Sequence, residues 1–222
     1  MKTALIAGST GLVGNELLKL LLNKADYDKV YALVRRPLNI QHPKLIEVDC
    51  DFNNLENVKD YFAVNDVYCC LGTTIKKAKT KDAMYKIDVD YPYKMGKLAV
   101  EKEVNHFIII SSMNANARSK LFYPRIKGLL EDKLKTLPLH TLSIVRPSLI
   151  LGNRSEKRFG EKVGMNTYKI LSHFLSEQSK NKLAIEARDV AVAMAALAKR
   201  DSEGLMVCSS QDMAEIVKQT KK

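Results

Sequence analysis

The sequence predicts an α/β fold in which a doubly wound parallel sheet is followed by a small C-terminal helical lid. Three observations lead to this prediction. The chain opens with a short apolar run that ends at a glycine-rich turn and continues as an amphipathic helix. Strand-like and helix-like patterns then alternate almost to the end of the 222 residues, as parallel strands with helical crossovers require. From about residue 151 the composition becomes polar, and we expect 151–222 to cover the carboxyl ends of the strands.

The first strand–helix unit carries the strongest functional signal. The apolar run 3–7 predicts a buried strand, and leucines recurring between polar residues from 17 onward predict a helix. The turn between them has the spacing Gly-x-x-Gly-x-x-Gly, which lets the backbone bend sharply and approach a pyrophosphate at the free N–H groups of the helix. A tight turn without a ligand is the alternative. The residues expected to bind the dinucleotide are Gly8, Ser9, Thr10, Gly11, Leu12, Val13 and Gly14.

The remaining elements follow in a single series without an internal repeat. We expect further strands over 30–34, 45–48, 66–71, 107–110 and 142–145, with helices over 53–62, 81–103 and 123–137. After the charged stretch 152–164, helices are expected over 165–174, 189–197 and 211–218, with a short strand over 205–208. Ser209 or Ser210 is expected to cap the last helix.

Composition narrows the class of protein. A hydrophobic content of 46% is typical of a globular domain with a core, and no apolar run reaches the length of a membrane span. No signal-peptide pattern opens the chain. The four cysteines lack the spacing of metal ligands, so we expect no metal site and reduced thiols in a cytoplasmic protein. The oligomeric state is left open between a monomer and a homodimer.

The net charge of +11 raises the question of a nucleic-acid partner. Positive residues are spread along the chain, with local clusters over 76–81 and 218–222. Aromatic residues do not interleave these clusters, and the chain carries no nucleic-acid motif. We therefore expect a solvated basic surface and no specific nucleic-acid partner, with part of the charge facing an anionic cofactor or substrate.

The end of the second strand predicts which dinucleotide binds. An acidic residue at this place accepts hydrogen bonds from the ribose hydroxyls of NAD, whereas an arginine pairs with the 2′-phosphate of NADP. Arg35 and Arg36 stand here, about 20 residues after the last glycine of the loop. We therefore expect NADP(H), with NAD(H) less favoured; two solvated arginines at a strand end are the alternative.

Two other strand ends are expected beside the cofactor. Asp51 and Phe52 follow the third strand and either border the adenine or form the cap of the next helix. After the fourth strand come Leu71, Gly72 and Thr73. Gly72 lets the backbone run close beneath the cofactor, and a threonine hydroxyl can reach a phosphate or ribose. A plain turn at the strand end is the alternative.

A second strong signal follows the fifth strand. Ser111 and Ser112 end that strand, and Tyr123 and Lys127 are spaced to share one face of the next helix. An ammonium beside a phenol lowers its pKa towards neutrality, and a serine hydroxyl can hydrogen-bond a carbonyl oxygen where charge develops. This spacing predicts an active site. Pro124 biases Tyr123 away from helical angles, so we expect Tyr123 at the very start of the helix.

Together these motifs resemble the short-chain dehydrogenase/reductase superfamily. The closest likeness is to atypical members with the glycine spacing of the epimerase-like branch, among them the Tat-interacting protein group and its bacterial relatives. The resemblance rests on the segments 8–14, 69–74, 110–112, 123–128, 146–148 and 151–154. It implies a single NAD(P)-binding Rossmann domain over 1–222, with 151–222 as the lid on the substrate side.

The same resemblance implies roles for individual residues. Ser112, Tyr123 and Lys127 take the catalytic roles, Ser111 lies beside the cofactor, and the nicotinamide side is contacted by Pro147, Ser148 and Leu149. It also implies an NADP(H)-dependent oxidoreductase acting on an unidentified small carbonyl or related substrate. Some relatives act through protein partners, so an NADP(H)-sensing regulatory protein is the alternative.

Overall fold

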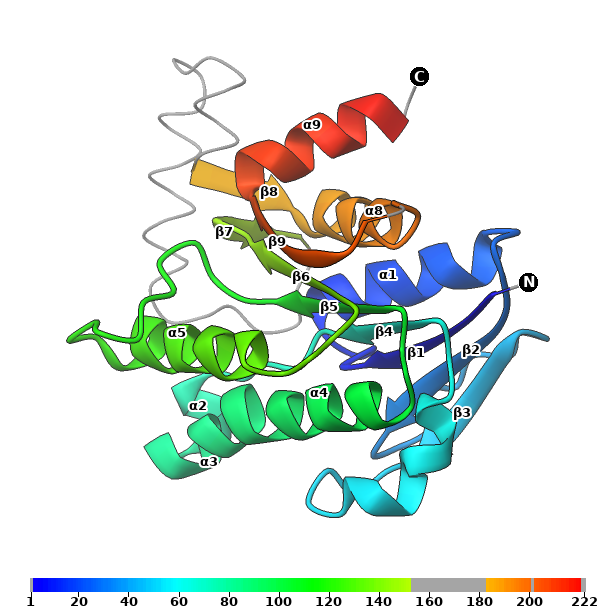
Figure 1. Ribbon diagram of the computed structural model, residues 1–222, viewed down its shortest axis with the longest axis horizontal. Helices are drawn as coiled ribbons and strands as arrows, with labels where there is room; N and C mark the ends of the chain where they lie inside the picture. The colour runs from blue at the N-terminus through cyan, green and yellow to red at the C-terminus, as the bar shows by residue number, and fades with distance from the viewer. Residues whose placement is uncertain (1, 153–182, 201, 221–222) are drawn as a thin grey trace.

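The main sheet is doubly wound and entirely parallel, as the sequence predicts. The computed structural model describes residues 2–152, 183–200 and 202–220, and Figure 1 shows their arrangement. Seven strands lie in the order β3-β2-β1-β4-β5-β6-β9. They are β1 (Lys2–Ala7), β2 (Tyr27–Val34), β3 (Leu45–Asp49), β4 (Asp66–Cys69), β5 (His106–Ile110), β6 (Thr141–Arg146) and β9 (Gly204–Ser209). A separate parallel pair is formed by β7 (Leu149–Leu151) and β8 (Ala184–Glu186).

Helices cover both faces of the sheet (Figure 1). One face packs against α1 (Leu12–Asn23), α8 (Ala187–Leu197) and α9 (Ser210–Thr220). The other face packs against η1 (Leu55–Phe62), α2 (Ile75–Ala78), α3 (Lys81–Tyr85), η2 (Lys86–Asp90), α4 (Tyr91–Glu101) and α5 (Phe122–Lys135). Within β1, Ile6 enters the first core and Leu5 the second. Because both faces are covered, these strands are continuous apolar runs, without the alternation of a half-exposed strand.

Three predicted elements differ from the structure, and the first is the helix expected over 53–62, which is the 3-10 helix η1. The long helix expected over 81–103 is divided by a π-helical turn, η2, which lies between α3 and α4. Strand β4 ends at Cys69 instead of residue 71, and the following residues turn directly into α2. Single π turns of this kind occur often at functional sites, because they re-aim the side chains they carry.

The C-terminal segment contributes to the body of the domain. Strand β9 joins the main sheet beside β6, and α8 packs against α1. The described residues after 182 are therefore built into the Rossmann domain, although the sequence analysis assigned them to a lid. The rest of the expected lid, including the helix expected over 165–174, lies outside the described residues.

One local expectation, the serine cap of the last helix, is confirmed. Ser209 caps α9, because its Oγ accepts a hydrogen bond from the N–H of Asp212 at 3.3 Å and that carboxylate accepts one from the N–H of Ser209 at 2.7 Å. All four cysteines are free thiols. Among the residues described, no helix is long and apolar enough to cross a membrane.

Candidate cofactor and active site

The glycine loop joins β1 to α1, and glycine is found at each of its three positions for a different physical reason. Gly8 has φ of +84°, and a Cβ there would lie 2.5 Å from the carbonyl oxygen of Cys70. A Cβ at Gly14 would lie 2.1 Å from the carbonyl oxygen of Gly8. Gly11 has φ of −75°, which any residue adopts, and a Cβ there would meet only the carbonyl oxygen of Gly8 at 3.2 Å. The fold requires Gly8 and Gly14, whereas Gly11 keeps open the space a ligand would fill.

The end of α1 at this loop fits an anion. The helix begins at Leu12 with Gly11 as its N-cap, so no side chain caps it, and its first turn holds no acidic residue. The Oγ of Ser9 is buried and has no hydrogen-bond partner among the described residues. Uncapped N–H groups, the positive end of the helix and an unpartnered buried hydroxyl are what a phosphate group needs. The loop therefore fits the pyrophosphate of a dinucleotide.

Arg35 and Arg36 are exposed and come immediately after β2, the strand that pairs with β1, so they lie beside the glycine loop. Burial and the nearby carboxylate of Asp51 raise the pKa of Tyr91, and the guanidinium of Arg35 opposes them. Arg35, Asp51 and Tyr91 thus form one electrostatic group at this corner. No ion pair holds either arginine within the described part of the chain, so both remain available to an anionic ligand.

Asp51 and Phe52 form the wall of that corner. The Oδ1 of Asp51 accepts a hydrogen bond from the N–H of Asn53 at 3.0 Å, which makes a local turn. The residue that caps η1 is Asn54, so Asp51 stands outside the cap itself. Phe52 is buried, with its ring centroid 5.6 Å from that of Tyr91. The buried ring fixes the wall beside Arg35.

The end of β4 covers a buried ion pair. The N–H of Thr73 donates to Oδ2 of Asp88 at 2.9 Å. A Cβ at Gly72 would lie 3.5 Å from Oδ1 of Asp88 and 3.9 Å from Nζ of Lys127. Leu71 is half-buried against the second core. The hydroxyl of Thr74, the residue after Thr73, caps α2. Gly72 therefore lets the chain pass close to these two charged groups.

Lys127 and Asp88 make this ion pair. Nζ of Lys127 lies 2.9 Å from Oδ1 of Asp88, and the two side chains are 3% and 0% exposed. Burial by itself lowers the pKa of Lys127, but the carboxylate of Asp88 and the neighbouring Tyr123 together outweigh it, and the pKa is raised above its usual value. Lys127 is therefore held as an ammonium, and the π turn η2 is the element that presents Asp88 to it.

The structure brings Tyr123 and Lys127 together, as their spacing predicts. Helix α5 begins at Phe122, so Tyr123 is its second residue, and Pro124 lies in the first turn, where a missing N–H costs little. Nζ of Lys127 lies 5.9 Å from the centroid of the Tyr123 ring. The ammonium thus lies over the ring while its ion-pair partner is Asp88, a partner the sequence analysis did not foresee.

The two serines after β5 differ in their surroundings. The hydroxyl of Ser111 is buried and donates to Glu131, a buried carboxylate that also pairs with Arg146. The hydroxyl of Ser112 is half-buried and has no partner within the described residues. Ser111 therefore anchors the strand end, and Ser112 is the serine whose hydroxyl is free to meet a ligand.

The loop after Ser112 packs tightly on α5. A Cβ at Gly128 would lie 2.1 Å from the backbone nitrogen of Ala117, so only glycine permits this approach. The N–H of Asn116 donates to the carbonyl oxygen of Pro124 at 3.0 Å. These contacts fix the loop against the helix that carries Tyr123 and Lys127.

The segment after β6 closes the other side. The carbonyl oxygen of Pro147 accepts from the N–H of Met113 at 3.1 Å, and the N–H of Ser148 donates to Oγ of Ser210 at 2.7 Å. Leu149 begins β7, and a Cβ at Gly152 would lie 2.9 Å from Cδ1 of Leu12. This segment therefore connects the loop after Ser112 with the glycine loop.

Asp88 is the residue of this site that the sequence analysis missed. A signal was present, because this aspartate stands directly between two apolar residues, Ile87 and Val89, in a predicted helix. Its partner is remote in sequence, so the pair becomes visible only once β4, η2 and α5 are placed. In the described part of the chain, no group of three or more His, Cys, Asp or Glu side chains is arranged to hold a metal ion.

Comparison with known proteins identifies the family. A family model described as HIM1 matches residues 45–180, a range that includes Asp88, Ser112, Tyr123 and Lys127. The chain belongs to the HIM1 family. Protein HTATIP2 of Rattus norvegicus is 35% identical over 164 residues, which cover 72% of this chain and 67% of that protein. The likeness to the Tat-interacting protein group that the motifs predict is thus confirmed.

A second relative of this HIM1 chain corrects one expectation. Protein FMP52, mitochondrial, of Eremothecium gossypii is 29% identical over 220 residues, which cover 97% of each chain. Other fungal relatives carry the same mitochondrial name. The expectation of a cytoplasmic protein, drawn from reduced cysteines and the lack of a signal-peptide pattern, is therefore wrong. Those two features do not separate the cytoplasm from other reducing compartments.

Solved structures confirm the fold. The structure titled "MoeE5 in complex with UDP-glucuronic acid and NAD" superposes with a TM-score of 0.71 at 17% identity. The match covers 93% of this chain and 75% of that one. The HIM1 chain therefore has the same Rossmann fold as that protein.

Proposed function

We propose that this HIM1 protein is an NADP(H)-dependent oxidoreductase of the short-chain type that acts on a small carbonyl compound. The observation that carries the proposal is the buried pair of Lys127 and Asp88, which lies beneath Gly72 and beside Tyr123 at the carboxyl ends of the strands. In a doubly wound sheet, ligands bind at this edge. A buried ion pair contributes little to the net stability of a protein, and buried charged groups in a cleft are typical of functional sites. A buried lysine that stays charged at this edge therefore favours a catalytic or binding role.

The cofactor-binding residues follow from the geometry. The glycine loop and the uncapped start of α1 would hold the pyrophosphate, and Arg35, assisted by Arg36, would hold a 2′-phosphate. Lys127 and the backbone at Gly72 and Thr73 would face the nicotinamide side. A likeness to proteins whose titles name NAD supports a nicotinamide cofactor. When bound, the nicotinamide ring supplies or accepts the hydride.

Side chains of the protein would carry out the proton transfer. The free hydroxyl of Ser112 would donate a hydrogen bond to the substrate carbonyl oxygen, where negative charge develops during reduction. The hydroxyl of Tyr123 would give that oxygen its proton. The ammonium of Lys127, held charged by Asp88, would stabilise the phenolate left behind. In the oxidative direction Tyr123 would take the proton back.

Substitution of Tyr123 tests the catalytic assignment. Tyr123→Phe removes the transferable proton and keeps the ring, so NADPH affinity and stability should persist while turnover falls by a factor of about 100 or more. Aldehydes, ketones and quinones would first be screened for NADPH oxidation. The assignment fails if a compound turns over and Tyr123→Phe works at the rate of the unmodified protein. Phe122→Tyr, one residue earlier, is a matched control: it alters a neighbouring aromatic ring by one hydroxyl, leaves Tyr123 in place, and should keep turnover.

Substitution of Arg35 tests the cofactor preference. A charge-assisted hydrogen bond to a phosphate contributes about 1.5–3 kcal/mol, which is about 10- to 100-fold in affinity. Arg35→Ala should lose most of the preference for NADPH and leave NADH affinity nearly unchanged. Equal affinities of the unmodified protein for the two cofactors would reject the proposed role of Arg35.

A regulatory function is the second candidate, and one observation favours it. Nζ of Lys127 lies 5.9 Å from the centroid of the Tyr123 ring, and within the described residues no hydrogen bond joins this ammonium to the Tyr123 hydroxyl. A protein that senses NADP(H) and changes a protein interface needs the cofactor site but no active tyrosine. If no carbonyl compound turns over while NADPH changes binding to a protein partner, the sensing function is supported over the enzymatic one.

A further inference from the structure

Three exposed apolar side chains stand beside the candidate active site. Seven large apolar side chains are exposed among the described residues, and three of them are Ile75 at 50%, Met113 at 50% and Leu121 at 70%. Met113 follows Ser112 directly, and Leu121 stands two residues before Tyr123. Ile75 begins α2, the helix that follows the end of β4. We call these three residues the apolar rim, and the apolar part of a ligand that covered it would gain binding free energy.

Positive charge surrounds the apolar rim without a negative counterpart. The segment 76–81 holds four lysines and no acidic residue, and the segment 111–125 holds two arginines, one lysine and no acidic residue. Lys76, Lys81 and Lys120 are exposed, and no ion pair joins any of them to another residue that the structure describes. Such a concentration of one sign attracts and orients an anion.

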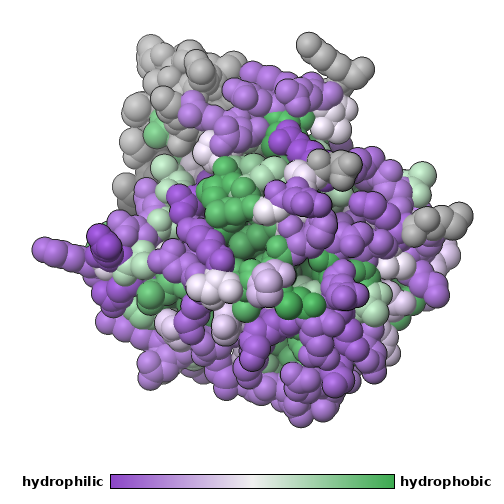
Figure 2. All heavy atoms as spheres, viewed as in Figure 1, coloured by the Kyte–Doolittle hydropathy of each residue, from purple (hydrophilic) through white to green (hydrophobic). Residues whose placement is uncertain are grey.

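The two basic segments lie side by side. Nζ of Lys81, at the start of α3, lies 5.6 Å from the ring centroid of Phe122, the first residue of α5. The guanidinium of Arg125 lies 5.9 Å from the same ring. In Figure 1, α2 and α3 lie beside the start of α5, at the edge where the strands end. Figure 2 shows hydrophobic side chains set among hydrophilic ones on this side of the molecule.

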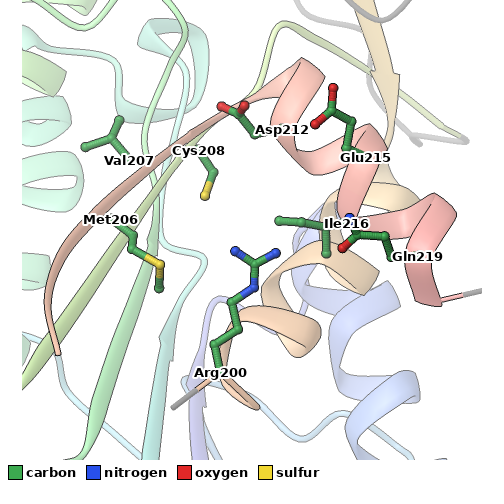
Figure 3. A pocket seen from close by; sticks show the side chains of 8 residues that line it. All are labelled: Arg200, Met206, Val207, Cys208, Asp212, Glu215, Ile216 and Gln219. Carbon is green, nitrogen blue, oxygen red and sulfur yellow. The ribbon is translucent and has the colours of Figure 1, made fainter. Parts of the chain in front are cut away.

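The pocket between β9 and α9 has a different distribution of charge (Figure 3). Its volume is about 300 Å³, and its lining includes the guanidinium of Arg200 and the carboxylates of Asp212 and Glu215, so both signs are present. Ile216, which also lines it, belongs to the core on the α9 side of the sheet, whereas Tyr123 packs against the core on the other side. This pocket is therefore separate from the candidate active site and offers no excess of positive charge.

We propose that the substrate of the candidate active site is an aliphatic aldehyde or ketone whose chain carries an anionic group, a carboxylate or a phosphate. This inference rests on the proposed function, because it takes Ser112 and Tyr123 as the groups that meet the carbonyl oxygen. The aliphatic part then lies on the apolar rim, and the anionic group reaches the cations around it. The carbonyl carbon receives the hydride of NADPH and the oxygen receives the proton of Tyr123, which gives the matching alcohol.

Unreactive probes test this surface without turnover. Octanoate and octyl phosphate combine the aliphatic chain with an anionic group, and octanol has the chain alone. Calorimetric titration of the NADPH-saturated protein should show tighter binding of at least one anion than of octanol, and the difference should shrink as salt is added. Which anion binds more tightly identifies the group as carboxylate or phosphate.

Charge reversal tests the role of the cations. Lys76→Glu and Lys120→Glu should each weaken binding of the anionic probe by about 3- to 10-fold at low salt and leave octanol binding unchanged. Lys218→Glu makes the same change of charge on α9, on the other face of the sheet, and should have little effect. Lys76→Glu and Lys120→Glu variants that bind the anionic probe as tightly as the unmodified protein would overturn the proposal.

Substitution of a leucine tests the apolar rim. Leu121→Ser should weaken binding of the anionic probe and of octanol alike, by about 3- to 10-fold, because a covered aliphatic side chain is lost. Leu205→Ser, at an exposed leucine of β9, should leave both affinities unchanged. Equal affinities for octanol and both anions would overturn the proposal. Binding to vesicles of anionic phospholipid by a protein that binds neither anionic probe would overturn it too.

Turnover separates this inference from the proposed function. The enzyme should reduce 8-oxooctanoate, or the aldehyde with a terminal phosphate, with a kcat/KM about 10-fold or more above that of octanal. If octanal is reduced as efficiently as both charged aldehydes, the inference is wrong and the proposed function stands. If no carbonyl compound is reduced, the proposed function is wrong and the inference falls with it.

Discussion

Replacement of Asp88 by asparagine should destabilise the protein strongly and in a characteristic pH-dependent way. Asparagine has the size of aspartate and can still accept the hydrogen bond from the N–H of Thr73. What the variant loses is the charge opposite Lys127, whose ammonium lies 2.9 Å away and is 3% exposed. Leaving one member of a buried ion pair without its partner costs about 3–5 kcal/mol. Because one hydrogen bond survives, we expect a loss of about 3 kcal/mol in the free energy of unfolding at pH 7.

The pH dependence identifies the cause. In the unmodified protein Asp88 raises the pKa of Lys127 above its unfolded value of about 10.4, so the stabilisation is fully present below that pH and is lost only above it. In Asp88→Asn the burial of Lys127, the largest single influence on its pKa, is no longer opposed by a carboxylate, and we expect the pKa to fall below the unfolded value. Stability of the variant should therefore rise as the pH increases from 7 towards 10, while that of the unmodified protein does not gain from this change.

Urea denaturation at several pH values between 7 and 10 measures both effects. The exposed pair of Asp60 and Lys102 provides the control, and Asp60→Asn should leave the unfolding free energy nearly unchanged. Lys127→Met combined with Asp88→Asn should be more stable at pH 7 than Asp88→Asn alone, because no uncompensated charge remains. An unfolding free energy of Asp88→Asn equal to that of the unmodified protein at pH 7 would refute the reasoning.

Two further predictions concern stability. Burial lowers the pKa of His106 from 6.5 to about 4, so the folded state resists protonation, and its stability should fall by about 1 kcal/mol as the pH drops from 6.5 to 5.5. His106→Gln should lack this part of the acid dependence in urea denaturation at matched pH values, and an identical dependence would contradict the prediction. Gly128→Ala should lower the thermal midpoint, because its Cβ would lie 2.1 Å from the backbone nitrogen of Ala117 and overpacking costs about 1–3 kcal/mol. An unchanged thermal midpoint in calorimetry would contradict the prediction, because it would show that the loop after Ser112 moves away from the added Cβ at little cost.

Most of the fold follows from the sequence because its patterns are local. Apolar runs bounded by turn residues predict all seven strands of the main sheet, and the crossover rule makes them parallel. The π turn at η2 was not predicted, since it adds one residue to a helical turn without breaking the polar and apolar pattern. The expected lid was wrong for β9 because a short apolar strand carries no local sign of which sheet it joins.

The candidate site was predicted where the spacing of residues within one element determines geometry. The three glycines and the Tyr123–Lys127 spacing each depend on a single turn or helix, and the structure brings these residues together as expected. The pair of Asp88 and Lys127 depends on η2 meeting α5, and the bond from Ser111 to Glu131 depends on β5 meeting α5. Such contacts depend on how separate elements pack against each other, which cannot be predicted from local sequence patterns.

The central claim is that the glycine loop binds the phosphates of NADPH, and calorimetric titration of Gly11→Asp tests it most directly. Gly11 has an extended backbone that accepts any residue, and a carboxylate at the start of α1 does not destabilise that helix. Thermal unfolding should therefore be nearly unchanged. The account predicts measurable NADPH binding by the unmodified protein and an affinity lower by about 10- to 100-fold or more in the variant, the equivalent of one or two lost phosphate hydrogen bonds. Unchanged NADPH affinity in Gly11→Asp would contradict it.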